Sequence, residues 1–478
     1  MRIDLQSLKS LILLVLLLLS VEQQCLATVT ATTVWEVMQD AGNADNGACF
    51  DGSVAVPGTD YSQQAASQYN AADLVIDGAD DTLITSASHN FVAADEGNCI
   101  RVSPGTGFTA GWYVITDTSA NAATLSSAVG TVGSTGGTYR VGGAALLNST
   151  NADDYFEAAV AGNTYWIKYN ASSHVLGEAV SVTADANSTT GVMIAGYNTT
   201  RGDNPAGATR PTIDQGVNGF VLAGDYFSVS NLIHTGTAVA VLQMGTGGQV
   251  TNVKVTNTSV SARIALSLNG ISSTVTKSEL ISTNGAALSL AIGNQSVIGN
   301  SIHDSVTCIQ TSTTDNHRFL FNLFRNCTTS GMLLGSGSDW LLIMYNTFVG
   351  AAAPAGTGIN GSAAVQSINT TIYGNIFWGW TTAVNMNANV DSIFSDYNDF
   401  YNNTTDRTNV DTGVNDLALD PQFTDVSGGD FSIGANLKAA GFPGTFPGSS
   451  TTGYLDMGAV QRQEPAAAGG QKAYGFVQ

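Results

Sequence analysis

The chain has 478 residues, of which only 11% are charged and 43% are hydrophobic, so it can build a large core and is not generally disordered. Its 53 glycines follow no three-residue period, which excludes a collagen-like chain. Sixteen basic residues against 37 acidic ones give a net charge of −21, so nucleic acid is not expected as a partner.

Residues 1–27 have the pattern of a secretory signal peptide. Arg2 and Lys9 precede an apolar run over 11–19, and Ala27 is a small residue suited to cleavage. A run of nine apolar residues cannot cross a bilayer, which needs roughly 20, and no later segment is apolar enough. We therefore expect a secreted or cell-surface protein without a membrane span, whose mature chain starts near Thr28.

The next part of the chain, 28–147, has the pattern of a small antiparallel β domain. Gly, Asp and Asn clusters separate short β-prone runs, which are 74–76, 82–84, 99–102, 112–115 and 138–141. A short helix is predicted over 153–160, with Asp153 at its start and Gly162 after its end. Its place before a long β region suggests a plug over the end of an open core.

Beyond this helix, as far as about residue 415, the sequence repeats. Asn recurs in a hydrophobic frame every 21–29 residues, with Lys277 filling one gap; the Asn positions are 231, 252, 300, 322, 346, 375 and 398. This spacing is typical of a solenoid, and Asn suits it because it tolerates a left-handed turn and can form an amide ladder. Leucine-rich repeats have a similar length, but their dense Leu register is missing.

The phase of the repeat predicts its interior. Two residues after each late Asn stand apolar side chains, namely Ile302, Phe324, Phe348, Phe377 and Phe400. Stacked parallel strands would place these about 4.8 Å apart, as an internal Phe stack. The earliest repeats fit less well, since Lys254 and Glu279 fall at the core position and require a shift of one residue.

The four cysteines beyond residue 27 allow two disulfides in an exported protein, with free buried Cys as the alternative. Proximity favours Cys49–Cys99 and Cys308–Cys327. Cys308 lies eight residues after the Asn of its repeat and Cys327 only five, which makes their direct stacking doubtful. Cys49–Cys99 is thus the better supported bridge. Because the repeat buries its own core, we expect any bridge to staple an end.

The repeats Phe321-Asn322-Leu323-Phe324, Tyr345-Asn346-Thr347-Phe348 and Gly374-Asn375-Ile376-Phe377 resemble the pectin-lyase-like superfamily of right-handed parallel β-helices. So does the ending, with Asp420-Pro421-Gln422-Phe423 and Tyr454 to Ala459. The glycine-rich stretch 136–143 is similar to segments of phage-like structural β-helix proteins. The resemblance implies an all-β fold: a β-rich domain over 28–147, a parallel β-helix over 148–415, a C-terminal cap over 416–465 and a flexible tail over 466–478.

The resemblance does not bring a complete catalytic set. The hydrolases of the family need paired acids and a Gly-His-Gly, and the repeat has neither. Lys277-Ser278 resembles the Lys-Ser of alginate- and chondroitin-cleaving lyases, with Lys277 as base, but position 298 is Ile where the companion Arg would stand. The other polar candidates are His303, Asp304 and Arg325, for which loop hydrogen bonding is the alternative.

Aromatic residues give a second kind of candidate site. Trp378 and Tyr401 lie three residues after the Asn of successive repeats, which places them on the outside, and Trp380 is close by. Exposed rings on a rigid face can stack on sugars, and packing under loops is the alternative. Nine Asp residues between 391 and 430 leave a bridging Ca²⁺ possible, with solvated Asp turns as the alternative.

These features predict a non-enzymatic structural or carbohydrate-binding protein whose partner is an extracellular polysaccharide or a cell-surface glycan. The alternative is a polysaccharide lyase or glycoside hydrolase of the same fold. The anionic composition favours neutral glycans over uronates. The sequence leaves open the glycan and the oligomeric state.

Overall fold

The computed structural model describes residues 26–39, 43, 45–147, 152–183, 189–312, 315–350, 353–362, 369–389, 392–441 and 455–461. The chain divides into two compact units. The N-terminal unit comprises Met1–Leu146 and Asn151–Val160, and the β-helix unit comprises Leu147–Thr150 and Ala161–Gln478. Of the expected signal segment, only Leu26 and Ala27 are among the described residues, and the expected tail 466–478 lies outside them.

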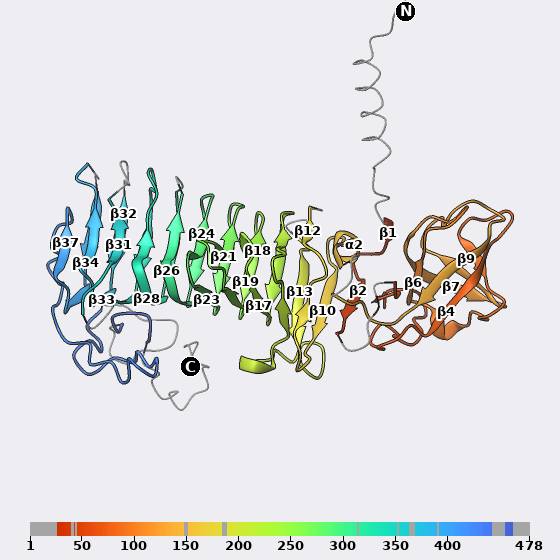
Figure 1. Cartoon of the computed structure of the whole chain (residues 1–478), viewed down its shortest axis with the longest axis horizontal. Helices are drawn as coiled ribbons and strands as arrows, with labels where there is room; N and C mark the ends of the chain where they lie inside the picture. Colours follow the sequence, from red (N-terminus) through yellow and green to blue (C-terminus); the bar gives the residue numbers. More distant parts are fainter. Residues whose placement is uncertain are drawn as a thin grey trace, which may run out of the picture. The chain divides into compact units, whose positions relative to one another are not determined.

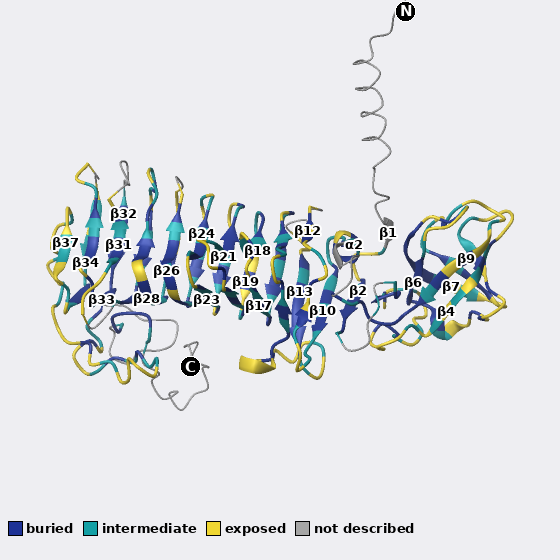
Figure 2. Cartoon of the chain, viewed as in Figure 1, coloured by how far each residue is buried: buried dark blue, intermediate teal, exposed yellow. Residues whose placement is uncertain are grey.

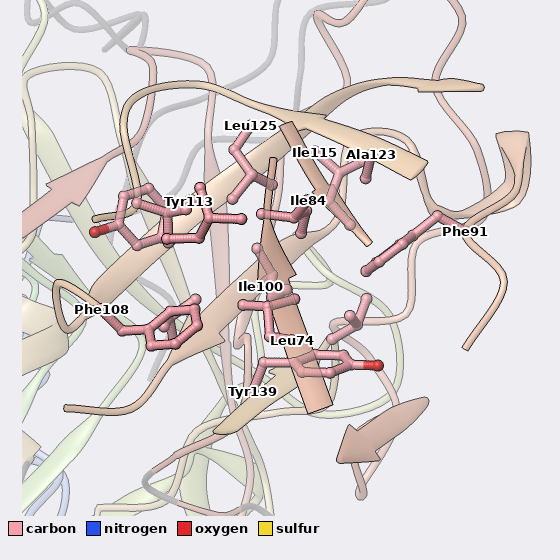
Figure 3. Packing of buried hydrophobic residues seen from close by; sticks show 14 residues of the cluster. Leu74, Ile84, Phe91, Ile100, Phe108, Tyr113, Ile115, Ala123, Leu125 and Tyr139 are labelled. Atoms are coloured by element: carbon pink, nitrogen blue, oxygen red, sulfur yellow. The ribbon is translucent and has the colours of Figure 1, made fainter. Parts of the chain in front are cut away.

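Six antiparallel strands close into a small barrel in the N-terminal unit. They are β4 (Tyr69–Ile76), β5 (Leu83–Thr85), β6 (Cys99–Val102), β7 (Gly111–Ser119), β8 (Ala122–Leu125) and β9 (Thr135–Val141). The pairings run β4-β5-β8-β7-β6-β9 and return to β4. Leu74, Ile100 and Tyr139 meet in the buried core (Figure 3). The barrel confirms the expected small antiparallel domain, because strand alternation gives each strand one apolar face.

The remaining elements of the N-terminal unit are short. They are β1 (Leu26–Thr28), β2 (Val34–Val37), β3 (Cys49–Phe50), the 3-10 helix η1 (Ala93–Asp95) and the helix α2 (Ala152–Glu157). The sequence-predicted helix over 153–160 therefore forms, but it is shorter. Its role as a plug stays a prediction.

The β-helix unit consists of parallel strands that stack rung upon rung in three faces (Figure 1). Face 1 comprises β10 (Thr164–Lys168), β13 (Val192–Tyr197), β16 (Phe227–Ser230), β19 (Gln249–Thr251), β22 (Thr274–Thr276), β25 (Ser296–Ile298), β27 (Arg318–Leu320), β29 (Leu342–Met344), β32 (Thr370–Tyr373) and β35 (Ile393–Asp396).

Faces 2 and 3 are the two legs of one bent sheet. Face 2 comprises β11 (His174–Val175), β14 (Thr212–Asp214), β17 (Ile233–Gly236), β20 (Lys254–Asn257), β23 (Glu279–Ser282), β30 (Thr347–Val349), β33 (Ile376–Trp378) and β36 (Asp399–Tyr401). Face 3 comprises β12 (Val180–Val182), β15 (Phe220–Leu222), β18 (Ala240–Met244), β21 (Ile264–Leu268), β24 (Ala286–Leu290), β31 (Thr357–Gly361), β34 (Thr382–Met386) and β37 (Thr405–Thr408). The long strands β26 (Ser301–Thr311) and β28 (Leu323–Leu333) run through both legs. This is a right-handed parallel β-helix, as the repeat predicts.

The interior of the β-helix contains the expected phenylalanine stack. Phe324 and Phe348 lie 4.5 Å apart between ring centroids, Phe348 and Phe377 4.8 Å, and Phe377 and Phe400 5.1 Å. All four rings are buried and nearly parallel. The strand register puts them in one column, because a parallel strand repeats the same side-chain position on each rung.

A buried asparagine ladder runs beside this stack, through Asn300, Asn322, Asn346, Asn375 and Asn398. In each step the side-chain nitrogen and the backbone N–H of one Asn donate to the side-chain oxygen of the next, at 2.9–3.0 Å. The carboxylate of Asp416 ends the ladder by accepting from the backbone N–H of Asn398 at 2.8 Å. The predicted amide ladder is therefore confirmed for the later rungs.

The early rungs differ by one residue, as the misplaced Lys254 and Glu279 indicate. Ile233 pairs with Lys254, Lys254 with Glu279 and Glu279 with Ser301, so Asn231 and Asn252 lie one position before the level of Asn300. These two Asn residues adopt the left-handed turn, with φ of 58° and 54°. In later rungs the preceding residue takes that turn, as Gly299, Phe321, Tyr345, Gly374 and Tyr397. The expectation that one Asn serves both purposes holds for Asn231 and Asn252, since Asn252 Nδ2 donates to Asn231 Oδ1 at 2.7 Å, whereas in the later rungs the turn and the ladder fall on neighbouring residues.

Both sequence-favoured disulfides are present. Cys49 and Cys99 join β3 to β6 with Cα atoms 5.2 Å apart, and Cys308 and Cys327 join β26 to β28 at 5.5 Å. The spacing made the second bridge doubtful, but it forms because the bend of the strands brings inward-facing residues of the two legs together. This bridge also lies within the β-helix and not at its end, contrary to expectation.

Residues 409–441 and 455–461, here called the C-terminal cover, fold back against face 2 near its end (Figure 1). Ile376 is buried in a cluster with Ile433, Leu437 and Met457. The backbone N–H of Ala459 donates to the side-chain oxygen of Thr347 at 2.9 Å. The outer surface of β30 and β33 is therefore covered by protein, while the turns of the unit are largely exposed (Figure 2). Among the described residues, no helix is long and apolar enough to cross a bilayer.

Candidate functional site

The expected aromatic platform of Trp378, Trp380 and Tyr401 does not form as one exposed surface. Trp378 and Tyr401 pair in register on successive rungs, as predicted, and both are half-buried. Trp380 is fully buried, and its indole N–H donates to the backbone oxygen of Phe348 at 3.1 Å. The placement of Trp380 in a stacking surface is therefore wrong.

The bend between faces 2 and 3 explains this correction. Gly379 is left-handed at the bend, with φ of 77°, so the in-out alternation that applies to β33 does not continue to Trp380. Trp378 also lies against Phe423 of the C-terminal cover, at 6.4 Å between ring centroids. A ring packed in this way has less surface for a sugar.

A cluster of charged side chains occupies the outer surface of face 2 on earlier rungs. We call it the charged cluster; its members are Lys254, Glu279, His303, Asp304 and Arg325. Three of the sequence-predicted candidates, His303, Asp304 and Arg325, are thus brought together. Lys277 is exposed at a left-handed turn with φ of 51° and belongs to none of these pairs.

The cluster is held together by short polar contacts. Lys254 Nζ lies 3.0 Å from Glu279 Oε1, and the same oxygen lies 3.1 Å from His303 Nε2. His303 Nδ1 lies 2.7 Å from Asp304 Oδ2. Arg325 Nη2 lies 3.2 Å from His303 Nε2, and Arg325 Nη1 lies 4.0 Å from Asp304 Oδ2. One imidazole therefore has contacts with both carboxylates.

Strand register places these side chains together. Lys254 pairs with Glu279 and Glu279 with Ser301, while His303 pairs with Arg325, so the cluster spans four consecutive rungs. Neighbouring parallel strands lie about 4.8 Å apart, so side chains in register on them can contact each other. Asp304 leaves this row at the bend, where its φ is 50°, and there Asn326 donates to Asp304 Oδ1 at 2.8 Å.

Both carboxylates of the cluster favour the ionised form. The hydrogen bond with His303 lowers the pKa of Glu279 to about 2 against the opposing effect of burial, and Lys254 adds to the lowering. Burial acts to raise the pKa of Asp304, but hydrogen bonds from Asn326 and His303 hold it below its usual value. Lys254 and Arg325 balance the negative charges of the two carboxylates. The cluster therefore holds positive and negative groups side by side, although the chain as a whole is strongly anionic.

The cluster is partly open to solvent. The side chains of Lys254, Glu279 and Arg325 are about one third exposed, at 32%, 33% and 28%, whereas His303 is only 4% exposed. A ligand on this face would therefore meet the two cations before the imidazole. The turn containing η2 (Gly207–Thr209) lies next to the early rungs, because Arg210 donates to the backbone oxygen of Asn252 at 2.9 Å.

Sequence reasoning missed Lys254 and Glu279 as site residues. Their signal was present as the poor fit of two charged residues to the core position. Once the early rungs are shifted by one residue, that position becomes an outward one, and Lys254 and Glu279 fall in one row. Spacing alone did not reveal this, because it cannot distinguish the ladder Asn from the turn Asn.

The bridging Ca²⁺ that the sequence leaves possible has no ready-made ligand set among the residues that the structure describes. Within the described residues, no group of three or more His, Cys, Asp or Glu side chains could hold a metal ion. Several of the Asp carboxylates after residue 391 accept hydrogen bonds in turns instead; Asp396 accepts from Asn415, and Asp425 from Gly428.

No protein-family model matches the chain, and no curated protein matches its sequence. Solved structures with a similar chain path include pectate lyase Pel9A, with 13% identity, a TM-score of 0.41 and coverage of 64% of this chain and 89% of that one. XylC in complex with xylose has 8% identity, a TM-score of 0.37 and coverage of 59% and 84%. The tailspike protein gp49 of Acinetobacter baumannii bacteriophage Fri1, a capsular polysaccharide depolymerase, has 9% identity, a TM-score of 0.31 and coverage of 67% and 72%. Function has to be argued from the residues of the site.

Proposed function

We propose that the chain is an extracellular protein that binds a polysaccharide across face 2 and cleaves it at the charged cluster by β-elimination. The observation that carries this proposal is the grouping of two cations, one imidazole and two carboxylates on consecutive rungs of a rigid sheet. The two disulfides support an oxidising, extracellular location. This choice favours the enzymatic alternative of the sequence analysis, because the aromatic platform that supported simple binding is largely packed.

The ionisation of the carboxylates favours elimination over hydrolysis. A glycoside hydrolase needs one carboxyl group that is protonated and can donate to the leaving oxygen. The lowered pKa values of Glu279 and Asp304 keep both ionised near neutral pH. Elimination instead needs a base that takes the proton next to a uronate carboxylate and a cation that neutralises that carboxylate. As the proton leaves, a C=C double bond forms, the C–O bond β to the carboxylate breaks, and the leaving oxygen takes a proton from solvent water.

The cluster contains groups suited to both tasks. In the proposed productive state the His303 ring is neutral: Nδ1 donates to Asp304, which orients the ring, and Nε2 takes the proton while Glu279 Oε1, 3.1 Å away, accepts from Lys254 instead. Arg325 and Lys254 are the cations that would bind the uronate carboxylate. In the proposal, Arg325 moves from His303 Nε2 to the incoming carboxylate and thereby uncovers the base, while Glu279 holds Lys254 in place.

The test is a panel of uronate-containing and neutral glycans. We expect ultraviolet-absorbing unsaturated ends from at least one uronate-containing glycan. His303→Gln should lower kcat at least about 100-fold, since a positioned base typically contributes 10²–10⁴-fold. Lys277→Ala is the matched control, because it removes an exposed cation two residues before Glu279, and it should retain activity within about twofold.

Other outcomes would contradict the proposal in distinct ways. Reducing ends without unsaturated ends would show hydrolysis. Retention of a glycan without any new ends would support the binding protein of the sequence analysis, and Trp378→Ala would then show whether the half-buried ring contributes. A loss of activity in Lys277→Ala as large as that in His303→Gln would move the base to Lys277.

A further inference from the structure

The Cys308–Cys327 disulfide lies directly behind the charged cluster. Cys308 Sγ is 3.2 Å from the backbone oxygen of Ile302 and 3.9 Å from that of Arg325, and Cys327 Sγ is 3.6 Å from the same Arg325 oxygen. Ile302 immediately precedes His303 in the chain. The bridge therefore contacts the backbone on both rungs that carry the central part of the cluster.

The disulfide also lies at the bend between faces 2 and 3 on these two rungs. Asp304 and Asn326 are both left-handed there, with φ of 50° and 52°, and their side chains are hydrogen bonded to each other. Beyond the bend the register slips, since Ser305 pairs with Cys327 but Thr307 pairs with Ser330. Strand β28 thus has one extra residue, and a bulge of this kind weakens the pairing that would otherwise fix the two rungs.

Both sulfur atoms are shielded in the interior. Cys308 has no exposed surface and Cys327 has 3%, while His303, on the outward side of the same strand, has 3%. The disulfide thus lies on the inner side of β26 and β28, and the His303 imidazole, Asp304 and Arg325 lie on the outer side of the same two rungs.

We propose that the Cys308–Cys327 disulfide is a positioning device for the charged cluster, so that the activity of the site depends on its oxidation. The inference rests on the proposed function. The disulfide holds the rung of His303 and Asp304 against the rung of Arg325 and Asn326 across the bulge. Opening it would let the two rungs shift, and a displacement of about 1 Å can cost about 100-fold in rate.

The experiment compares the two disulfides of the same chain. The Cys49→Ser/Cys99→Ser double variant retains only the Cys308–Cys327 bridge and is the matched control. We expect its activity to stay within about twofold of wild type. The Cys308→Ser/Cys327→Ser variant should lose at least about tenfold in kcat with KM changed less than about threefold, because the reacting groups are misplaced while the rest of the sugar face is intact.

If the Cys308→Ser/Cys327→Ser variant does not fold, chemical reduction of the Cys308–Cys327 disulfide still tests the inference. Treating the folded Cys49→Ser/Cys99→Ser protein with a phosphine reductant opens only Cys308–Cys327, and kcat should fall to the same extent and return on reoxidation. Unchanged kcat after verified reduction would overturn the inference while leaving the proposed function intact.

A spectroscopic readout separates the inference from the proposed function. The chain has five His residues, so selective ¹⁵N labelling gives few imidazole signals, and His303→Gln identifies that of His303. Opening the bridge should shift the His303 nitrogen signals and leave those of His89, in the N-terminal unit, unchanged. If wild type cleaves no glycan, the proposed function fails, and this measurement still decides the positioning; signals that do not move would overturn it.

Discussion

Phe348 lies between Phe324 and Phe377 in the interior stack, at 4.5 Å and 4.8 Å between ring centroids. Phe348→Ala would remove one ring from a column of four and leave a void between two rungs. We expect the unfolding free energy of the β-helix unit to fall by about 3–5 kcal/mol, as for other large-to-small core changes. Denaturant unfolding monitored by fluorescence measures this, with Phe394→Ala as control because Phe394 is 56% exposed. Equal effects of the two substitutions would show that the stack contributes little.

Asn346 contributes to stability through hydrogen bonds. Its side chain donates to Asn375 Oδ1 and to the backbone oxygen of Phe319, and it accepts from the backbone N–H and side chain of Asn322. Asn346→Ala would leave buried backbone groups without partners, each costing about 1–3 kcal/mol. We expect a loss of at least about 2 kcal/mol in the same unfolding measurement. Asn415→Ala, at an exposed position, is the control; a ladder variant as stable as this control would contradict the assignment.

At the scale of elements, Gly458 anchors the C-terminal cover on face 2. Its φ is 83°, and a Cβ at this position would come within 2.5 Å of Thr347 Oγ1 and 2.6 Å of an Ile376 side-chain atom. Gly458→Ala should therefore combine left-handed strain, about 1–2 kcal/mol, with a clash that pushes the cover away. Faster limited proteolysis within residues 409–461 would report this.

Gly429 provides a matched control for that prediction. Its φ is 84°, but a Cβ there would have no atom within 4 Å. Gly429→Ala therefore introduces the backbone strain without the clash. If both variants are cleaved at the same rate, contact with Thr347 and Ile376 does not hold the cover in place.

The sequence predicted those elements in which one position repeats without interruption. The Phe348 column follows from spacing alone, because parallel strands convert a sequence period into a stack. Trp380 and the Cys308–Cys327 bridge were misjudged for a shared reason. Both lie at or beyond the bend between faces 2 and 3, where a left-handed residue and, in β28, an extra residue change which side chains face inward. Neither feature has a sequence signal at the level of spacing.

The charged cluster shows the same limit for the site. His303, Asp304 and Arg325 were candidates as separate polar residues, but their association depends on the register of β26 with β28. Lys254 and Glu279 join them only after the early rungs are shifted by one residue. The residue types therefore indicated the chemistry of the site, whereas the fold was needed to show which of these side chains lie together.

At the scale of the whole molecule, buried histidines make stability depend on pH. Burial lowers the pKa of His234 to about 3, and it lowers that of His317 to about 4 against the opposing effect of Asp315. In the unfolded chain these groups take up protons below about pH 6.5, whereas the folded protein does not. Stability from the two histidines is thus present above pH 6.5 and is lost as the pH falls toward 4. We expect His317→Gln to flatten this acid loss in unfolding curves measured from pH 8 to pH 4; an unchanged slope would contradict it.

Asp399 has the opposite effect on the same curve. Burial raises its pKa to about 7, with Asp406 and Asp420 adding to the increase, and its Oδ2 is buried without a hydrogen-bond partner. The folded protein keeps this proton between pH 3.8 and pH 7 while the unfolded chain releases it, so stability falls as the pH rises through this range. Each unit of pKa difference corresponds to about 1.4 kcal/mol.

Asp399→Asn removes the ionisation and keeps an oxygen that can accept from the backbone N–H of Leu419. Relative to wild type, the variant should therefore gain more than about 1 kcal/mol between pH 5 and pH 8. Asp411→Asn removes the same charge from an exposed position and is the control. If both substitutions change stability equally at every pH, Asp399 does not carry the proton.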